Sequence, residues 1–259
     1  MDASLTARPP TPWFGHPRGL VVLFLTEMWE RFSFYGMKAL LIYYMIRHLQ
    51  FSQADASLIY GAYTGGVYLT PIFGGYIADR WLGRRRAIQI GGSLMALGHF
   101  VLASEALFFP ALLLIALGNG LFLPNLPSQV GDLYDPQDPR RGGSYNIYYV
   151  GVNLGALLAP LVCGTLGEVY GWHVGFGAAG LGMCLGLAIY QLGARHLPPD
   201  RAIEQPGIEV RQAEMCRERL GNRALARSGR SVDGDDHALC LRARHALARP
   251  HKAIAAQKN

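Results

Sequence analysis

Long apolar stretches alternate with short polar segments along the chain as far as Arg195. A helix needs about 20 mainly apolar residues to cross the hydrocarbon core of a bilayer, at about 1.5 Å of rise per residue. The stretches that reach this length cover residues 20–46, 55–78, 87–108, 111–131, 143–166 and 172–194. The pattern predicts an all-α membrane protein with six transmembrane helices.

Glycine is frequent inside these stretches. Gly65 and Gly66 lie in the second stretch, Gly151 and Gly155 in the fifth, and Gly180 in the sixth. Glycine destabilises helices in water, whereas in lipid small residues let neighbouring helices approach closely. We therefore expect the helices to pack together as one bundle.

The composition fits a membrane bundle with polar ends. Of the 259 residues, 51% are hydrophobic and 16% are charged, against roughly 25% charged in ordinary soluble domains. Residues 1–19 are predicted to form a cytosolic lead-in, residues 20–195 the six-helix bundle, and residues 196–259 a polar, Arg-rich tail. Two interpretations of the tail stay open: a disordered cytosolic segment, or translation of a GC-rich gene in a shifted frame.

Basic residues concentrate on one side of the predicted bundle. With the N-terminus inside, the cytoplasmic side carries Arg8, Arg18, Arg80, Arg84, Arg85, Arg86, Arg140, Arg141 and Arg195. The opposite loops carry only Arg47. Because Lys and Arg favour cytoplasmic loops, both ends of the bundle are predicted to be cytoplasmic, in a multi-pass protein of a bacterial inner membrane.

Several classes of function are not expected. Most of the formal net charge of +6 lies in the tail, and the loops show no basic face interleaved with aromatic residues, so nucleic acid is a poor partner. The chain shows no metal-ligand spacing of Cys, no Ser/His/Asp set and no phosphate-binding loop, so neither a metal site nor an enzyme is expected. His99 and His173 are predicted to be packing or interface residues.

Charged residues interrupt the first apolar stretch at Glu27, Glu30, Arg31 and Lys38. Each charge inside a bilayer costs at least ~2.5–3.5 kcal/mol on insertion scales. Together with Tyr35 they follow helical spacing and share one face. A structural ion pair would need only two of these charges. The pattern therefore favours a site where a carboxylate binds and releases a proton beside a switchable Arg.

This run resembles the ExxERFxYY signature of the proton-dependent oligopeptide transporters, a branch of the major facilitator superfamily. The resemblance implies that Glu27, Glu30 and Arg31 couple transport to protons. It also implies that Tyr35 and Lys38 bind substrate. Phe34 stands where the family usually has a Tyr, which implies that one hydrogen bond to substrate is missing.

The loop after the second stretch resembles the superfamily's cytoplasmic GxxxDRxGRR loop. The matching residues are Gly75, Asp79, Arg80, Gly83 and Arg84. Asp79 can pair with an Arg across the loop, and such a latch would hold one gating state. A plain positive-inside anchor is the alternative, although an anchor does not need the Gly-Asp-Gly spacing.

The fifth stretch resembles a second family signature, in which aromatic residues precede an Asn. By resemblance, Asn153 binds a peptide terminus in the central cavity, and Tyr68 lines the same cavity. An interhelical hydrogen bond is the alternative for Asn153. Leu123 stands where the family usually has a Lys that pairs with the signature Glu. Either the coupling runs through Glu30 and Arg31 alone, or the substrate preference has shifted.

The resemblance implies the N-terminal half of a major facilitator bundle, built as two inverted three-helix repeats. The implied function is import of di- and tripeptides coupled to protons by a truncated, incomplete carrier, with the proton gradient in place of any cofactor. The implied partners are small peptides, protons, the lipid bilayer, and either a second transporter half or another copy of the chain. A carrier for another small solute, such as nitrate, and a non-transporting membrane remnant are the alternatives.

Overall fold

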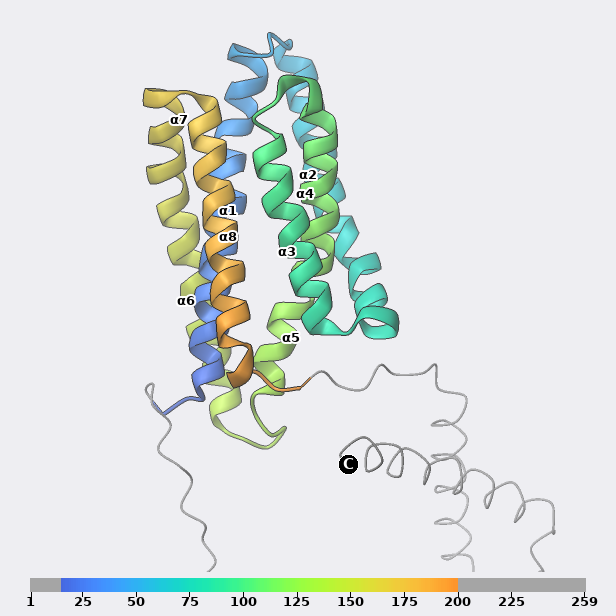
Figure 1. Ribbon diagram of the computed structural model, residues 1–259, viewed down its shortest axis with the longest axis vertical. Helices are drawn as coiled ribbons and strands as arrows, with labels where there is room; N and C mark the ends of the chain where they lie inside the picture. Colours follow the sequence, from blue (N-terminus) through green and yellow to red (C-terminus); the bar gives the residue numbers. More distant parts are fainter. Residues whose placement is uncertain (1–14, 200–259) are drawn as a thin grey trace, which may run out of the picture. The chain divides into compact units, whose positions relative to one another are not determined.

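The computed structural model describes residues 15–199. Most of the predicted lead-in and the tail from residue 200, including both interpretations of that tail, lie outside the described residues. The regular elements of residues 15–199 are all helical (Figure 1). The long helices are α1 (Arg18–Arg47), α2 (Gln53–Ile77), α3 (Arg84–Val101), α4 (Phe108–Phe122), α6 (Arg140–Ala159) and α8 (Trp172–Gly193). The shorter elements are η1 (Ala78–Leu82), η2 (Glu105–Leu107), α5 (Asn125–Asp132), η3 (Pro160–Gly164), α7 (Thr165–Tyr170) and η4 (Ala194–His196).

Each apolar stretch of the sequence contains a long helix, and the boundaries differ most in the third and fourth stretches. In the stretch predicted over 87–108, helix α3 ends at Val101, earlier than predicted. The next long helix, α4, begins at Phe108. The stretch predicted over 111–131 is divided, because α4 ends at Phe122 and α5 begins at Asn125. Pro124 lies at this break, where its missing N–H removes a helical hydrogen bond.

Three helical stretches of the described part are long and apolar enough to cross a membrane by length and composition: Glu105–Asp132, Arg140–Tyr170 and Trp172–His196. Helices α1, α2 and α3 are not among these three stretches. In α1, Glu27, Glu30, Arg31 and Lys38 interrupt the apolar sequence. By length and composition, the described residues thus belong to a helical membrane protein.

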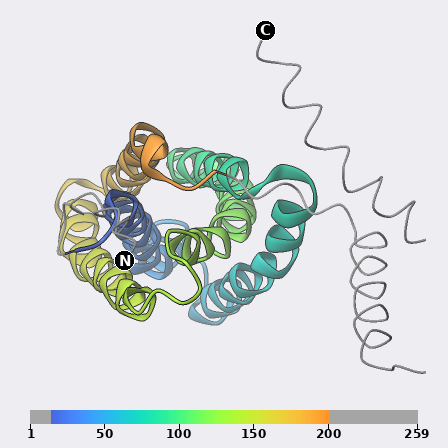
Figure 2. The same cartoon turned by 90° about the horizontal axis from the view of Figure 1, so that it is seen from below.

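The helices pack in two neighbouring groups. Helix α1 lies mainly against α6 and α8, while α4 lies against α2 and α3 (Figures 1 and 2). Helices α3 and α8 also pack together and so join the two groups. The charged turn of α1 therefore lies inside the bundle, covered by α6 and α8.

Glycine permits the closest of these approaches. A Cβ atom on Gly74 of α2 would collide with the carbonyl oxygen of Gly120 on α4. A Cβ atom on Gly155 of α6 would collide with the carbonyl oxygen of Met28 on α1. The close packing expected from the glycines is confirmed at Gly155, whereas Gly65 and Gly66 have no neighbour within 4 Å of an added Cβ in residues 15–199.

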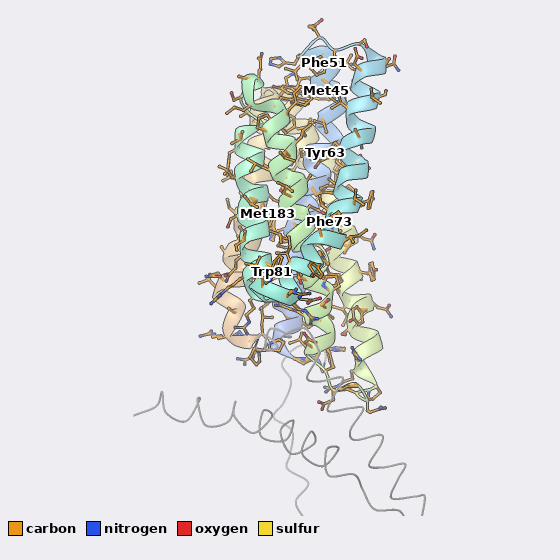
Figure 3. The ribbon with its side chains drawn as sticks, turned by 90° about the vertical axis from the view of Figure 1, so that its right-hand side faces the viewer. Met45, Phe51, Tyr63, Phe73, Trp81 and Met183 are labelled. Atoms are coloured by element: carbon orange, nitrogen blue, oxygen red, sulfur yellow. The ribbon has the colours of Figure 1, made fainter. Side chains whose placement is uncertain are left out.

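Apolar side chains lie on the outside of the bundle as well as in its core. Met45 and Met183 are fully buried, whereas Phe73 on α2 and Trp81 on η1 are 61% and 62% exposed (Figure 3). In water such exposure of large apolar side chains is unfavourable. It suits a surface that contacts lipid or another protein.

Candidate functional site

Three charged groups meet on one buried turn of α1. Arg31 Nε donates a hydrogen bond to Glu27 Oε1 over 2.7 Å and lies 3.0 Å from Glu30 Oε2. Glu27 and Glu30 are 1% and 0% exposed, and the Arg31 side chain is 11% exposed. The structure thus brings these three predicted residues together on one helix turn.

The charges of this cluster do not balance. Two carboxylates face one guanidinium, which leaves one negative charge in excess when both are ionised. Among the described residues, Glu27 Oε2 and both Glu30 oxygens accept no hydrogen bond. Buried polar atoms are normally hydrogen-bonded, so the cluster retains free capacity to take up a proton or a donor group.

Glycines on the neighbouring helices place the cluster inside the bundle. A Cβ atom on Gly155 of α6 would lie 2.9 Å from Arg31 Cβ. A Cβ atom on Gly186 of α8 would lie 3.8 Å from the backbone nitrogen of Glu30. Because neither glycine carries a side chain, α6 and α8 pack directly onto the charged turn.

Two tyrosines complete the surroundings of the carboxylates. Tyr148 on α6 lies beside Glu27, and Tyr63 on α2 lies near Glu30. Both rings are buried; the Tyr148 hydroxyl is a hydrogen-bonding neighbour of the Glu27 carboxylate, whereas the Tyr63 hydroxyl has no hydrogen-bond partner among residues 15–199. The sequence indicated an aromatic run around Tyr148 but gave no signal for Tyr63, because its role depends on how α2 lies beside α1.

Lys38 does not join the carboxylates. Its ammonium nitrogen lies 5.4 Å from the centre of the Phe34 ring and 5.2 Å from the centre of the Tyr60 ring. Such distances allow cation–π attraction. Phe34 is only 4% exposed, so the residue that departs from the family signature supports Lys38 from within the bundle. Tyr60 was not identified from the sequence.

The other predicted substrate residues lie near the surface of the bundle. Tyr35 on α1 is 36% exposed and Tyr68 on α2 is 68% exposed. Asn153 on α6 is exposed, and its Nδ2 donates to the carbonyl oxygen of Tyr149 over 2.9 Å. This bond is to its own helix, and within residues 15–199 the side chain forms no interhelical hydrogen bond of the kind considered from the sequence.

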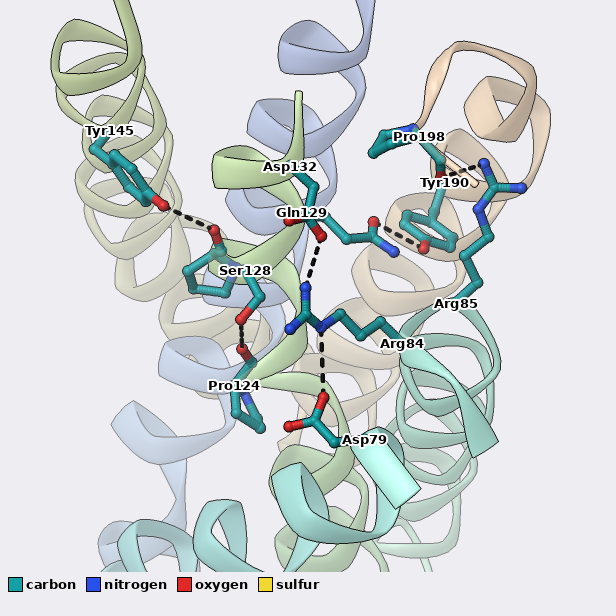
Figure 4. Close-up of polar contacts among 11 residues, drawn as sticks. Asp79, Arg84, Arg85, Pro124, Ser128, Gln129, Asp132, Tyr145, Tyr190 and Pro198 are labelled. Carbon is teal, nitrogen blue, oxygen red and sulfur yellow. Dashed lines mark hydrogen bonds and ion pairs between the residues drawn. The ribbon is translucent and has the colours of Figure 1, made fainter. Parts of the chain in front are cut away.

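The predicted gating loop folds around Arg84 (Figure 4). Arg84 Nη1 donates to Asp132 Oδ2 over 2.6 Å, and its Nε lies 3.5 Å from Asp79 Oδ1. The predicted pairing of Asp79 with an Arg is thus present. Of the two contacts that Arg84 makes with carboxylates, the contact with Asp79 is the longer. Asp132 was not identified from the sequence, because its helix α5 is distant along the chain.

The remaining loop residues have separate roles. Arg80 donates to the hydroxyl of Tyr76 over 2.8 Å. Gly83 has φ of 78°, a backbone conformation that glycine adopts without strain. Gly75 lies beside Pro124 of the α4–α5 break, where an added Cβ would be 3.6 Å from the Pro ring.

The same end of the bundle carries a second arginine contact. Arg85 Nη2 donates to the carbonyl oxygens of Leu197 and Pro198 over 2.6 Å and 2.7 Å (Figure 4). Nearby, the Tyr190 hydroxyl donates to Gln129 Oε1 over 3.0 Å. These contacts connect the beginning of α3 to the segment that follows η4, and the middle of α5 to the last turn of α8.

Residues 15–199 contain no group of three or more His, Cys, Asp or Glu side chains placed to hold a metal ion. Fold and site together define a helical membrane protein with a charged cluster on a buried helix turn.

Comparison with known proteins identifies its family. The sequence profile described as POT family matches residues 85–227, more than half of the chain. The chain belongs to this family, which is a family of transporters.

Similar sequences carry transporter names. The chain is 46% identical over 197 residues to the di-/tripeptide transporter of Lactococcus lactis subsp. lactis (strain IL1403), covering 72% of this chain and 40% of that protein. It is 45% identical over 201 residues to the peptide transporter YePEPT of Yersinia enterocolitica subsp. palearctica, covering 74% and 39%. The chain thus spans about 40% of the length of these relatives.

Solved structures resemble the bundle. A crystal structure of a peptide transporter POT in complex with sulfate has a TM-score of 0.73 and 41% identity, covering 84% of this chain and 46% of that one. A POT family transporter in complex with 5-aminolevulinic acid has a TM-score of 0.72 and 36% identity, covering 84% and 47%.

Proposed function

We propose that the described bundle forms one half of a proton-coupled carrier of di- and tripeptides in the major facilitator superfamily. The observation that carries this proposal is the position of Arg31 between the buried carboxylates of Glu27 and Glu30. Membership of the POT family and the peptide carriers among its relatives support it.

The proposed coupling follows from charge balance. With both carboxylates ionised, the cluster has a net charge of −1 in a setting where unbalanced charge is unfavourable. Binding of one proton makes the cluster neutral. The protonated carboxyl also gains an O–H donor and loses its negative charge. Arg31 therefore loses one of its two anionic neighbours and becomes available to another anion.

A peptide offers such an anion at its carboxyl terminus. We propose that the substrate contacts Tyr35, Lys38, Tyr68 and Asn153, which lie on α1, α2 and α6. Lys38 has an aromatic setting and no carboxylate within ion-pair distance among the described residues. These side chains form one wall, so transport needs an opposing wall from a second transporter half or from another copy of the chain.

The proposed membrane arrangement has six crossings, made by α1, α2, α3, α4 with α5, α6 with α7, and α8. In a bacterial inner membrane, the positive-inside rule places the end that carries Arg84, Arg85 and Arg140 in the cytoplasm. The contacts of Arg84 with Asp79 and Asp132 would then form a latch at the cytoplasmic end. Its opening and closing would accompany alternating access.

Another small solute, such as nitrate, is the second candidate. Two observations favour it: Leu123 at the α4–α5 break supplies no cation, and Phe34 is buried beneath Lys38 without a hydroxyl. A related transporter is described in complex with 5-aminolevulinic acid, which is not a peptide. In a non-transporting membrane remnant, the charged cluster would bind no transported proton and the proposed substrate side chains would bind no substrate.

A complementation experiment tests the proposal. The 259-residue chain is expressed with the second half of the Lactococcus transporter in cells that lack their own peptide carriers. Proton-driven accumulation of a dipeptide is expected from the pair and not from either half alone. Accumulation of nitrate but not dipeptide would favour the second candidate. Failure of both, with both halves present in the membrane, would contradict a transport function.

A further inference from the structure

A buried histidine links the charged helix to its neighbour. His99 on α3 is 0% exposed, and its Nδ1 lies 2.6 Å from the carbonyl oxygen of Met95 on the same helix. Its Nε2 lies 3.1 Å from Ser33 Oγ and 3.3 Å from the Ser33 carbonyl oxygen, both on α1. Ser33 is also 0% exposed.

The shortest contact of the ring assigns the proton of the neutral imidazole to Nδ1. A carbonyl oxygen can only accept, so Nδ1 carries a proton and donates to Met95. In the neutral imidazole Nε2 then accepts a hydrogen bond from the Ser33 hydroxyl over 3.1 Å. The longer 3.3 Å approach of Nε2 to the Ser33 carbonyl oxygen joins two acceptors in this tautomer and is not a hydrogen bond. The contact with Ser33 is thus specific, whereas the contact with Met95 is local to α3.

The link joins elements that otherwise pack elsewhere. Helix α1 packs mainly against α6 and α8, and α3 packs mainly against α4 and α8. Ser33 is three residues after Glu30, and residues at this spacing are neighbours on the same face of a helix. The bond therefore restrains the rotation of α1 at the turn that carries the carboxylates.

We propose that His99 is a positioning residue for the Glu27–Glu30–Arg31 cluster, acting through Ser33. It holds the charged turn of α1 in register with α3, so the carboxylates keep their geometry around Arg31. The inference rests on the proposed role of this cluster in proton binding. It assigns to His99 more than the packing role expected from the sequence.

Two amide substitutions separate the two contacts of the ring. In His99→Gln the side-chain amide reaches the position of Nε2 and can keep the bond to Ser33. In His99→Asn the shorter side chain reaches only the position of Nδ1 and keeps the bond to Met95. The same pair at exposed His173 is the matched control.

The readout is the rate at which dicyclohexylcarbodiimide modifies Glu27 and Glu30 in the purified 259-residue chain, measured by mass spectrometry at several pH values. Loss of one hydrogen bond corresponds to about a fivefold change in an equilibrium, and we expect a change of this size in His99→Asn. We expect His99→Gln to remain close to the unmodified chain, and both His173 variants to be unchanged.

Equal effects of His99→Gln and His99→Asn, or no effect of either, would overturn the proposal. If His99→Asn does not fold, Ser33→Ala is used in its place, and Ser33→Thr, which keeps the hydroxyl, is its control. A modification rate that changes equally in both Ser33 variants would also overturn the proposal. Because this readout requires no transport, it separates the two proposals. A changed rate without dipeptide uptake by the complemented carrier would contradict the proposed function alone.

Discussion

Arg31 Nε donates to Glu27 Oε1 across one turn of α1, over 2.7 Å. The same nitrogen lies 3.0 Å from Glu30, so one guanidinium holds two buried carboxylates. Removal of one partner from a buried ion pair leaves an uncompensated charge. This relationship gives the first prediction.

Arg31→Gln is expected to lower the stability of the bundle by about 3–5 kcal/mol, the usual cost of breaking a buried pair from one side. The triple replacement of Glu27, Glu30 and Arg31 by Gln is expected to recover part of this loss, because it leaves no charge behind. Unfolding of the purified chain in detergent measures both. Equal stability of the single variant and the unmodified chain would show that the cluster does not depend on Arg31.

The contact between α2 and α4 gives the second prediction. Gly74→Ala is expected to destabilise the bundle by about 1–3 kcal/mol, because the added methyl overpacks against the Gly120 carbonyl. Gly66→Ala on the same helix is the control, since nothing lies within 4 Å of its added Cβ. Thermal unfolding compares the two. A Gly66 variant as unstable as the Gly74 variant would contradict the observed packing.

The latch around Arg84 gives the third. Asp132→Asn is expected to cost about 1.5–3 kcal/mol, because it removes a short hydrogen bond between charged groups at a side chain that is 13% exposed. Asp79→Asn is expected to cost less than about 1 kcal/mol, since its side chain is 63% exposed and its contact is 3.5 Å long. Denaturant unfolding distinguishes them, and the reverse order would mean that Asp79 is the main partner of Arg84.

The orientation in the membrane is the fourth prediction. A reporter that is active only in the periplasm is expected to be active when inserted at Ser52, before α2, and silent when fused after Leu197. The excess of arginine at the end that carries Arg84 and Arg85 is the reason. The opposite pattern of activity would reverse the proposed orientation.

The sequence predicted the helices well because apolar length and polar breaks are local properties. The division of the fourth stretch at Pro124 is also local, yet a single Pro inside an apolar run does not reveal whether the helix bends or stops. The grouping of Glu27, Glu30 and Arg31 was predictable because all three lie on one helix with spacing of three and four residues.

What could not be predicted depends on neighbours from other helices. Spacing placed Lys38 on the same face of α1 as Arg31, but it could not show that Tyr60 of α2 covers that position. Likewise Asp132 reaches Arg84, and His99 reaches Ser33, across long separations in sequence. Spacing within one helix identifies a face, while the residues that cover the face follow from tertiary packing.

Proton coupling through the cluster is the central claim, and Glu30→Gln in the complemented carrier tests it most directly. Gln keeps the shape of the side chain and removes its ability to titrate. Dipeptide uptake driven by a pH gradient is expected to be lost, while exchange of dipeptide at equal pH on both sides continues. Driven uptake that is unchanged in both Glu30→Gln and Glu27→Gln would contradict the claim and leave these carboxylates a structural role.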